Sequence, residues 1–542
     1  MANAFFEPPY PINEPILDYR PGSPERKEIQ AQLAFLKSQM LNIPMIINGQ
    51  PVETGDTVSI HPPHEHAHTL GHYHKGHKEH VRLAIEAALS AKAKWENMPW
   101  QERASIFLKA ADLIAGPYRA RINATTMLGQ SKNVFQAEID AACEFADFLR
   151  FNVAFMTQMY DGQPESAPGI WNKMEYRPLE GFIFALTPFN FTSIAGNLGG
   201  APALLGNTVV WKPAETQIYS AKVIMDVFIE AGLPAGVINL VFVDGPDAGE
   251  VIFSHPDFAG LHFTGSTQVF QHLWKEIGNN IATYKSYPRI VGETGGKDFI
   301  VAHTSSHVPK LITALTLAAF EFQGQKCSAC SRAYIPESLW EEVKAGLVRD
   351  VESFKIGSPE DFTNFINAVI DEKAFDKISG YIEQAKQSSD AEIIIGGACD
   401  KSKGYFIQPT VVQAKKSDFV TMQEEIFGPV LTVYVYPDHE FENILDVVDQ
   451  TSPYALTGSI FATDRYAITL AKKKLKHAAG NFYVNDKPTG AVVGQQPFGG
   501  ARGSGTNDKA GSILNLYRWI SAQTIKETFD APTDYRYPFM EE

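Results

Sequence analysis

The sequence predicts an α/β protein with two doubly wound domains, in which parallel strands alternate with helices. Short runs that are apolar on both faces, such as FIFALT at 182–187, are typical of strands buried inside a parallel sheet. Amphipathic stretches such as 220–232 separate these runs and have the residue spacing of helices. The same alternation begins again near residue 310, so we expect two sheets, each covered by helices.

The first block is preceded by helices and by a polar insertion. Residues 25–40 and most of 81–159 carry apolar residues three and four positions apart, which predicts helices. Residues 162–177 are polar and contain Pro and Gly, which is typical of a hairpin that projects from the body. Beyond them we expect strands and helices in alternation: strands at 182–187, 208–212, 238–243, 260–265 and 289–295, and helices at 220–232, 248–254 and 269–278.

The second block has the same character. The junction between the blocks lies near 295–297, where glycines follow a predicted strand. Beyond it we expect helices at 311–320 and 340–354 and strands at 331–336, 391–397, 430–436 and 458–463. The chain is therefore expected to hold two α/β domains in sequence.

The composition excludes several classes of protein. The chain has 542 residues and a formal net charge of −15, which argues against a general binder of nucleic acid or of anionic membranes. Its four cysteines are too few for a disulfide framework and indicate a reducing compartment. The first twenty residues contain three acidic side chains and no apolar leader, so we expect a cytoplasmic protein, with a mature mitochondrial matrix chain as the alternative. The uncharged run at 181–211 is interrupted by Pro, Asn and Gly, which favours a buried passage over a membrane helix.

One cysteine lies where reactive thiols are found. Cys327, in GQKCSACSR, falls between a predicted helix and a predicted strand, a junction that suits an exposed, activated thiol. A redox pair with Cys330, a zinc site, and a single nucleophile with a bystander cysteine are all compatible with this segment. A zinc site lacks a second ligand pair at suitable spacing. On these residues alone, a buried structural cysteine is as well supported as the three others together.

Other polar residues follow predicted strands, where functional groups gather in open α/β sheets. Glu293 lies in GETGGK, and Asn190 in TPFNF could donate a hydrogen bond to an oxyanion. Lys212 and Glu215 end the strand in VVWKPAE, and Gly265 in FTGS opens a turn whose N–H groups could meet a phosphate. Taken singly, each of these residues is explained at least as well by a structural role, as a helix cap, a turn residue or a surface charge, as by a functional one.

Taken in order, these motifs make the chain resemble the aldehyde dehydrogenase superfamily from about residue 45 to 530. The matching segments are TPFNF, WKPAE, FTGS, GETGGK, GQKC, EEIFGP and QPFGG. Longer segments are similar to the branch that oxidises L-glutamate γ-semialdehyde, formed from Δ1-pyrroline-5-carboxylate, to L-glutamate in proline degradation: GQKCSACSR, EEIFGPVLTVYVYPD, AAGNFYVNDK and VGQQPFGGARGSGTNDKAG. The resemblance implies an aldehyde dehydrogenase-like fold with a Rossmann-like NAD-binding domain (1–160 and 180–295), a catalytic domain (296–519) and small oligomerisation elements (161–179 and 520–542).

The resemblance also implies a covalent mechanism. Cys327 is expected to attack the aldehyde and form a thiohemiacetal, while the Asn190 amide and the Cys327 backbone N–H hold the oxyanion. Loss of hydride to NAD leaves a thioester, and Glu293 activates the water that hydrolyses it. Glu293 argues against an acylating, CoA-dependent enzyme, because a thioester meant for CoA should be kept from activated water. The presence of Cys327, Asn190 and Glu293 together argues against a non-enzymatic binding protein. Another aldehyde substrate remains an alternative.

The resemblance also implies a binding site for NAD. Glu215 favours NAD over NADP, because a carboxylate pairs with a ribose diol and repels a 2′-phosphate. The sequence departs from many family members at Phe270, where they carry a glycine. The expected contacts cover the adenine ribose (Thr187, Lys212, Glu215), the pyrophosphate (Gly265, Ser266) and the nicotinamide ribose and ring (Glu425, Phe427).

For the substrate, the resemblance implies a pocket that holds an α-amino acid head group. Ser328 and the backbone of Gly490 and Ala491 are expected to bind the carboxylate, although many members carry Ser at the last position. Glu144 is expected near the ammonium, with a carboxylate on a helix surface as the alternative. Phe191 and Phe498 are expected to flank the aliphatic stem.

The remaining expectations concern partners and metals. We expect a homodimer or higher homo-oligomer, a proline dehydrogenase as a possible partner, and neither nucleic acid nor membrane. Eight histidines lie between residues 61 and 80. Because this segment is punctuated by Pro and Gly, we interpret it as a solvated surface stretch rather than a metal site.

Overall fold

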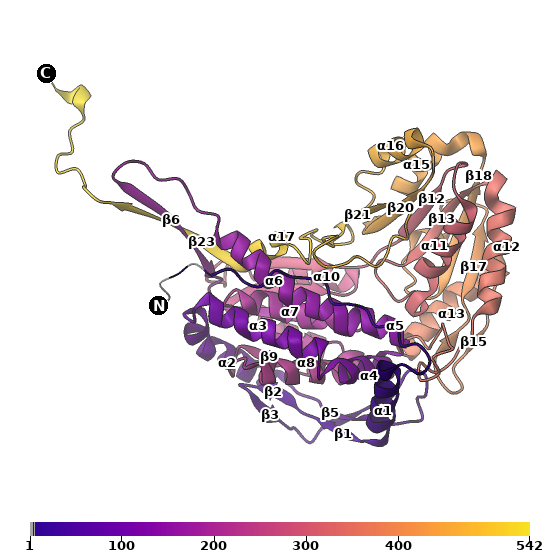
Figure 1. The fold of residues 1–542 in the computed structure, drawn as a ribbon, viewed down its shortest axis with the longest axis horizontal. Helices are drawn as coiled ribbons and strands as arrows, with labels where there is room; N and C mark the ends of the chain where they lie inside the picture. The colour runs from indigo at the N-terminus through magenta and orange to yellow at the C-terminus, as the bar shows by residue number, and fades with distance from the viewer. Residues whose placement is uncertain (1–3, 5, 542) are drawn as a thin grey trace.

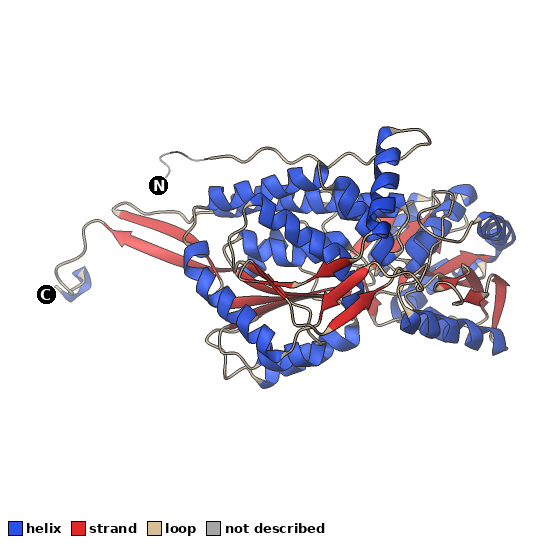
Figure 2. Ribbon diagram, turned by 90° about the horizontal axis from the view of Figure 1, so that it is seen from below, coloured by secondary structure: helices blue, strands red, loops and turns tan. Residues whose placement is uncertain are grey.

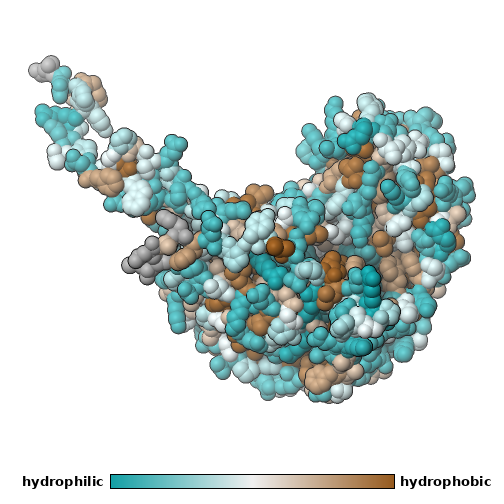
Figure 3. Space-filling model, in the orientation of Figure 1, coloured by the Kyte–Doolittle hydropathy of each residue, from teal (hydrophilic) through white to brown (hydrophobic). Residues whose placement is uncertain are grey.

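The computed structural model describes residue 4 and residues 6–541 of the chain. Two lobes lie side by side, and an arm that carries the C-terminal segment projects from one of them (Figure 1). The face drawn in Figure 3 is mainly hydrophilic, with hydrophobic residues in small separate groups, as the high net charge leads one to expect. No helix in the described part of the chain is both long and apolar enough to span a membrane.

The first lobe is built on a seven-stranded sheet. Five neighbouring strands, beginning at one edge, are parallel, and two short strands extend the other edge through antiparallel pairing. Strands β8 and β10 are buried along their whole length, which explains why their sequences are apolar on both faces. The strand order is β11 (Arg289–Glu293), β10 (Phe258–Thr264), β7 (Phe182–Thr187), β8 (Thr208–Pro213), β9 (Ile238–Leu240), β2 (Met45–Ile47) and β3 (Gln50–Val52).

Helices cover both faces of this sheet (Figure 2). A π-helix, η1 (Glu138–Glu144), interrupts them directly before α6, and α7 is buried all round. The helices of the lobe are α1 (Pro24–Ser38), α2 (Lys78–Glu96), α3 (Trp100–Ala115), α4 (Arg119–Gln130), α5 (Val134–Ala137), α6 (Phe145–Tyr160), α7 (Thr192–Leu204), α8 (Ile218–Ala231), α9 (Gly245–Phe253) and α10 (Thr267–Asn279), with the short η2 (Glu215–Gln217).

The second lobe repeats the architecture with another seven-stranded sheet, parallel except for β14 at its edge. The order is β14 (Ala391–Ile395), β17 (Thr410–Ala414), β18 (Val430–Tyr436), β13 (Cys330–Pro336), β12 (Asp298–Ala302), β20 (Thr457–Phe461) and β21 (Asn481–Val484). Its helices are α11 (Val308–Phe320), η3 (Glu321–Gly324), α12 (Glu337–Ser353), α13 (Glu372–Gln387), α14 (Val420–Gln423), η4 (Asp438–Glu440), α15 (Phe441–Gln450) and α16 (Arg465–Lys474). The chain then returns to the first lobe, where α17 (Ile513–Leu516) and η5 (Tyr517–Trp519) join its core. The doubly wound α/β fold is thus confirmed, although the sequence analysis missed β12, β17 and β21.

The expected hairpin at 162–177 is wrong. One strand of the arm, β6 (Ile170–Pro178), pairs antiparallel with β23 (Ile520–Thr528) over nine residue pairs. The two segments are more than three hundred residues apart in sequence, so no local turn signal could announce the pairing. Beyond β23 the chain continues to η6 (Pro538–Met540) at the tip of the arm (Figure 1).

The histidine-rich segment is also not the solvated stretch that we expected. It forms β5 (Gly71–His74), the middle strand of a small sheet with β1 (Leu41–Ile43) and β4 (Thr57–Ile60). His64 and His74 are buried. Their rings keep hydrogen-bond partners inside the fold: His64 with Ser131 Oγ at 3.1 Å and His74 with Asn42 Oδ1 at 2.9 Å. Among the described residues, no cluster of His, Cys, Asp and Glu could hold a metal ion.

Phe270 fixes α10 to the first sheet. Its ring stacks on Phe263 with centroids 5.3 Å apart and meets Trp274 edge-on at 5.5 Å. A Cβ on Gly292 would lie 2.2 Å from the same ring, so strand β11 has a glycine where the ring packs. The departure from the family's glycine therefore fills a space between the helix and two strands.

We predict that Phe270→Ala destabilises the first lobe. Removing a buried aromatic ring leaves a cavity and costs about 3 kcal/mol. Thermal unfolding followed by calorimetry should show a lower transition temperature. Val269→Ala, on the exposed side of the same helix, is the control and should leave the transition unchanged. Equal transition temperatures for both variants would contradict this role of Phe270.

Candidate active site

A cavity of about 550 Å³ lies between the lobes and gathers most of the predicted site. Its walls come from η1, the start of α7, the end of β11, the turn before β13 and the loop after β21. Two predicted catalytic residues and all six predicted substrate residues line it: Cys327, Glu293, Glu144, Phe191, Ser328, Gly490, Ala491 and Phe498. Segments as far apart in sequence as Asn13 and Asn515 therefore face one enclosed space.

Cys327 differs from the exposed, activated thiol that we expected. It lies in the turn between η3 and β13 and is 9% exposed. Burial and the carboxylates of Glu293, Asp298 and Glu425 raise the pKa of the thiol well above its ordinary value. The expectation failed because the turn is covered by loops of both lobes, so the resting side chain is a neutral thiol.

The second cysteine of the motif has a different environment. Cys330 begins β13, is fully buried in the core of the second lobe, and its Sγ contacts the Arg332 carbonyl at 3.4 Å. Burial raises the pKa of its thiol to about 12. All four cysteines are free, so the structure contains no Cys327–Cys330 disulfide.

Two glycines allow the backbone to approach this site closely. A Cβ on Gly296 would lie 2.3 Å from the carbonyl oxygen of Cys327, and one on Gly295 would lie 2.2 Å from a carboxylate oxygen of Glu425. Any larger residue would push these groups apart. The Gly296 N–H donates to Glu425 Oε1 at 2.9 Å, which holds this carboxylate in place.

Glu293 ends β11 and faces the cavity. Burial raises the pKa of its carboxyl to about 8, and the positive charge of Lys509 opposes this shift. The ionised form of a carboxyl group with such a pKa is a stronger base than an ordinary carboxylate and can accept a proton from water. Asn190 follows β7 and is buried, and its amide donates to the Gln325 carbonyl at 3.2 Å, in the turn that carries Cys327. Its second amide hydrogen remains for another acceptor.

The predicted cofactor residues lie at the carboxyl ends of the first sheet's strands and on one segment of the second lobe. Lys212 is buried, and burial lowers the pKa of its ammonium; its Nζ is 3.5 Å from the Pro213 carbonyl. Glu215 is exposed at the start of η2. Thr187 accepts a hydrogen bond from Trp211 Nε1 at 3.0 Å, so its hydroxyl braces the end of β8.

The turn before α10 is already partly hydrogen-bonded. The N–H of Gly265 donates to the Glu293 carbonyl at 3.1 Å, so it is not free for a phosphate in this structure. Ser266 is the N-cap of α10 and accepts from Val269 N at 3.3 Å. In the second lobe, Phe427 has a φ of 63° and packs edge-on against Phe189 at 5.9 Å.

The substrate side contains residues that the sequence analysis missed. Ser328 Oγ is hydrogen-bonded to Thr489 Oγ1 at 2.8 Å, and Lys326 and Lys487 also line the cavity. Both ammonium groups pair with Glu321, at 2.8 and 3.1 Å. The position of Lys326 directly before Cys327 was the only sequence signal for these residues. A lysine next to a cysteine does not by itself show that its side chain lines the same cavity.

Glu144 is not a helix-surface carboxylate, which was the alternative. It ends the π-helix η1, and its Oε2 is hydrogen-bonded to Ser193 Oγ at 2.8 Å. Burial raises the pKa of its carboxyl to about 8, and the charge of Asp140 raises it further. Single π turns occur often at functional sites, and here the wider turn carries the acidic residue that faces the cavity.

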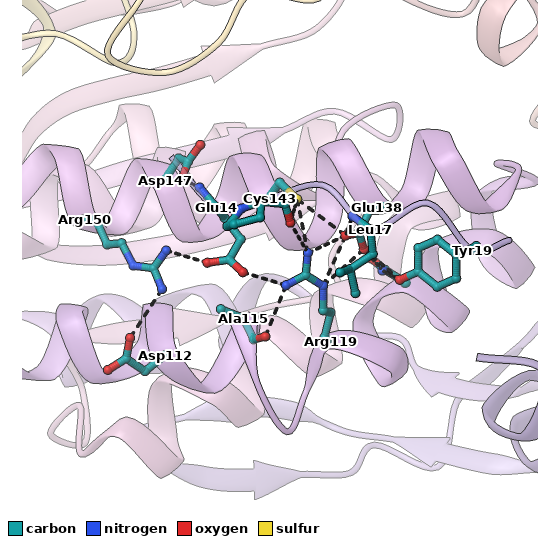
Figure 4. A network of polar contacts seen from close by, with 12 residues as sticks. Glu14, Leu17, Tyr19, Asp112, Ala115, Arg119, Glu138, Cys143, Asp147 and Arg150 are labelled. Atoms are coloured by element: carbon teal, nitrogen blue, oxygen red, sulfur yellow. Dashed lines mark hydrogen bonds and ion pairs between the residues drawn. The ribbon is translucent and has the colours of Figure 1, made fainter. Parts of the chain in front are cut away.

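A segment near the N-terminus forms another wall, which the sequence analysis did not foresee (Figure 4). Asn13, Glu14 and Ile16 line the cavity. Glu14 pairs with Arg119 at 2.6 Å and with Arg150 at 2.7 Å, which fixes the segment along α4 and α6.

The same segment is held at two further points. Its continuation is bonded to Glu138: the N–H of Leu17 donates at 2.9 Å and the Tyr19 hydroxyl at 2.8 Å. Asn13 connects this wall to the loop after β21, because its amide donates to Asp147 Oδ2 and to the Val493 carbonyl, each at 2.8 Å. The segment thus links α6 to the loop that carries three of the expected substrate residues.

A sequence model of a protein family, described as the aldehyde dehydrogenase family, matches residues 51–525 of the chain. The chain belongs to this family. The resemblance read from the motifs is therefore confirmed, and the aldehyde dehydrogenase fold with it.

Individual relatives are similar to this aldehyde dehydrogenase over almost its whole length. The mitochondrial Δ1-pyrroline-5-carboxylate dehydrogenase of Dictyostelium discoideum is 53% identical, over 98% of this chain and 96% of the relative. The human mitochondrial enzyme of the same name is 47% identical, over 98% and 94%. The crystal structure of the Mycobacterium tuberculosis Δ-pyrroline-5-carboxylate dehydrogenase bound with NAD covers all of both chains at 52% identity, with a TM-score of 0.96.

We predict that Cys327→Ala abolishes aldehyde oxidation, whereas Cys330→Ala keeps most of it. Of the two cysteines in this motif, only Cys327 lines the cavity, and the covalent route needs only one thiol. Initial rates of NADH formation and a thermal unfolding curve for each variant check this. A folded Cys330→Ala variant that is as inactive as Cys327→Ala would restore the redox-pair interpretation.

We predict that Asn13→Ala raises the KM for the aldehyde about tenfold with a smaller change in kcat. The substitution removes three hydrogen bonds, two to the loop (with the Val493 carbonyl and Gln495 Nε2) and one to Asp147, together worth about 1.5 kcal/mol. Ile12→Ala, at an exposed neighbour, is the control. If both variants have the KM of the unmodified enzyme, the segment does not position the loop.

Proposed function

We propose that this aldehyde dehydrogenase oxidises L-glutamate γ-semialdehyde to L-glutamate with NAD, as a step of proline degradation. One observation carries the proposal: a single cavity contains a thiol, a carboxyl poised as a base, an acid for an ammonium and donors for a carboxylate. Relatives that share about half of the sequence over nearly its full length are named for Δ1-pyrroline-5-carboxylate. That compound is the cyclic form of the proposed substrate.

The chemistry follows from the chain's own groups. Cys327 Sγ attacks the aldehyde carbon as its thiol proton passes to solvent water, and the oxyanion that forms accepts hydrogen bonds from the Asn190 amide and the Cys327 N–H. NAD, when bound, accepts the hydride that leaves this carbon. Ionised Glu293 then takes one proton from water as the water oxygen attacks the thioester carbon. The C–S bond breaks, the sulfur takes the proton from Glu293 to restore the thiol, and the second water proton goes to solvent as the carboxylate is released.

The residues at the sheet's carboxyl edge fit the proposed cofactor. Lys212 is a buried cation whose only near acceptor among the described residues is a carbonyl at 3.5 Å, so its hydrogens are available to ribose oxygens. We assign Lys212, Glu215 and Thr187 to the adenine ribose, Gly265 and Ser266 to the pyrophosphate, and Glu425 and Phe427 to the nicotinamide half. The exposed carboxylate of Glu215 disfavours a 2′-phosphate, so NAD is the expected dinucleotide.

The substrate assignment completes the site. Ser328, Gly490 and Ala491 bind the α-carboxylate, Glu144 the ammonium, and Phe191 and Phe498 the stem. In this proposal the segments 1–160 and 180–295 form the NAD-binding domain and 296–519 the catalytic domain. The arm, within 161–179 and 520–542, joins subunits of a homo-oligomer. A proline dehydrogenase partner and a cytoplasmic or mitochondrial location stay predictions.

The direct test measures NADH formation from Δ1-pyrroline-5-carboxylate. Substrate-dependent NADH, with L-glutamate as the product and no requirement for CoA, is the expected result. NADP should give a much lower kcat/KM, and Glu215→Ala should narrow the difference. Activity only in the presence of CoA, or equal kcat/KM for an aldehyde without the amino acid head group, would overturn the proposal.

The pKa of Glu293 predicts how turnover depends on pH. The base must be ionised, so kcat at saturating substrate should rise as the pH increases through about 8 and then level off. Glu293→Gln should show one rapid burst of NADH near one per site, followed by slow turnover that lacks this pH dependence. A variant without the burst would place Glu293 in the attack step instead.

A further inference from the structure

The hydroxyl group of Ser193 lies between two carboxyl groups. Its Oγ is 2.8 Å from Asp140 Oδ1 and 2.8 Å from Glu144 Oε2, and the side chain is fully buried. A serine hydroxyl has one hydrogen and can donate it to only one of these oxygens. For both contacts to be hydrogen bonds, one of the two carboxyl groups must carry a proton and donate it to Ser193.

The hydrogen-bond partners of Asp140 show that it is the ionised member. It accepts from the N–H groups of Thr192 and Ser193, from Ser193 Oγ and from Lys132 Nζ, the last at 2.6 Å. These four donors use every acceptor position of a carboxylate, which a bound proton would remove. Lys132 is itself buried, with its ammonium 4.2 Å from the ring centre of Phe191 and 4.5 Å from that of Phe322.

Glu144 is therefore the member that holds the proton. Only its Oε2 is hydrogen-bonded, and Oε1 has no hydrogen-bond partner among residues 4 and 6–541. The nearby charges of Asp140 and Asp147 oppose ionisation of Glu144, and that of Lys132 favours it. The other titratable groups facing the cavity come from the N-terminal segment (Glu14), η1 (Cys143), β10 (His262), β11 (Glu293), the turn before β13 (Lys326, Cys327) and the loops after β21 (Lys487, Asp508).

We propose that binding of the substrate's ammonium group is coupled to the release of a proton from Glu144, and that the Ser193 hydroxyl then turns from Asp140 to Glu144. The inference rests on the proposed function, because it needs an ammonium at this position. The O–H bond of Glu144 breaks, its proton passes to the solvent, and no other group changes its charge. Ser193 acts as a positioning residue, since its single hydrogen can satisfy whichever carboxylate lacks a donor.

The coupling has a consequence for selectivity. An aldehyde without an ammonium meets a neutral acid and gains nothing from it, whereas a cationic head group gains an ion pair in a water-poor site. Lys132 keeps Asp140 satisfied when the hydroxyl turns away, so the cost of the rearrangement is small. Affinity for an α-amino acid ligand should therefore rise about tenfold for each unit by which the pH is raised, up to about pH 8.

The test compares two ligands that differ only in the amino group, L-norvaline and pentanoate. Neither has a carboxyl group at the reacting end, so Glu293 is not perturbed by the ligand's own charge there. Calorimetric titrations at about pH 7, in buffers with different ionisation enthalpies, report the number of protons released. We expect about 0.9 proton per site for L-norvaline and none for pentanoate.

Two variants keep the test decisive. Glu144→Gln should bind L-norvaline more weakly, release no proton and lose the pH dependence of binding between about pH 6 and 8. Ser193→Ala should bind L-norvaline several-fold more weakly at about pH 7 while pentanoate binding stays unchanged, because the ionised Glu144 then lacks its donor. A purely structural role would weaken both ligands equally.

The outcomes separate this inference from the proposed function. If L-norvaline and L-glutamate bind to the unmodified enzyme without releasing a proton, the coupling is wrong and the function stands. If Glu144→Gln releases as many protons as the unmodified enzyme, another group is the source and the assignment to Glu144 is wrong. If neither amino acid binds, the proposed substrate fails together with the coupling.

Discussion

The two sheets are joined by four residues, 294–297, and the site depends on this short connection. Strand β11 ends at Glu293 and β12 begins at Asp298, so the first sheet's last parallel strand leads directly into the second lobe. Within the connection, Gly296 lies against the Cys327 carbonyl and donates its N–H to Glu425. A carboxyl from one lobe and a thiol from the other are thus placed together by the backbone itself. The glycines permit an approach that no side chain would allow.

The same closeness sets the electrostatics. Glu293, Asp298 and Glu425 all raise the pKa of the Cys327 thiol, and each of these carboxyl groups has a raised pKa because it is buried. In such surroundings the resting enzyme holds protons on groups that the proposed mechanism requires to give them up. A neutral thiol is a poor nucleophile toward oxidants, so the arrangement protects the cysteine between turnovers. Across the cavity, Asp140 keeps its charge because Lys132 and two backbone N–H groups stabilise it. Charge is therefore retained only where donors surround it.

The sequence predicted the parts of the fold whose signal is local. Strands such as 182–187 and 208–212 are buried on both faces and read as apolar runs, and the motifs at their ends placed Glu293 and Cys327 around one cavity. What could not be predicted depends on distant partners. The strand at 170–178 finds its partner at 520–528, and Asn13 finds Asp147 and Val493. The burial of His64 depends on Ser131 in another segment. The wider π turn before α6 changes which face carries Glu144, and no periodic pattern announces a single inserted residue.

The two strands of the arm are synthesised far apart in time, so the arm forms late in translation. Strand β6 leaves the ribosome some 340 residues before β23, its only partner in the described part of the chain. Until then its edge has unpaired N–H and C=O groups, which invite contact with any other strand. Its lysine, arginine and glutamate side chains limit such contacts while synthesis continues. Because the pairing strand follows the entire second lobe, the arm can form only on a polypeptide whose second lobe has been translated. Completion of the arm is thus a built-in record that translation has reached beyond Cys327.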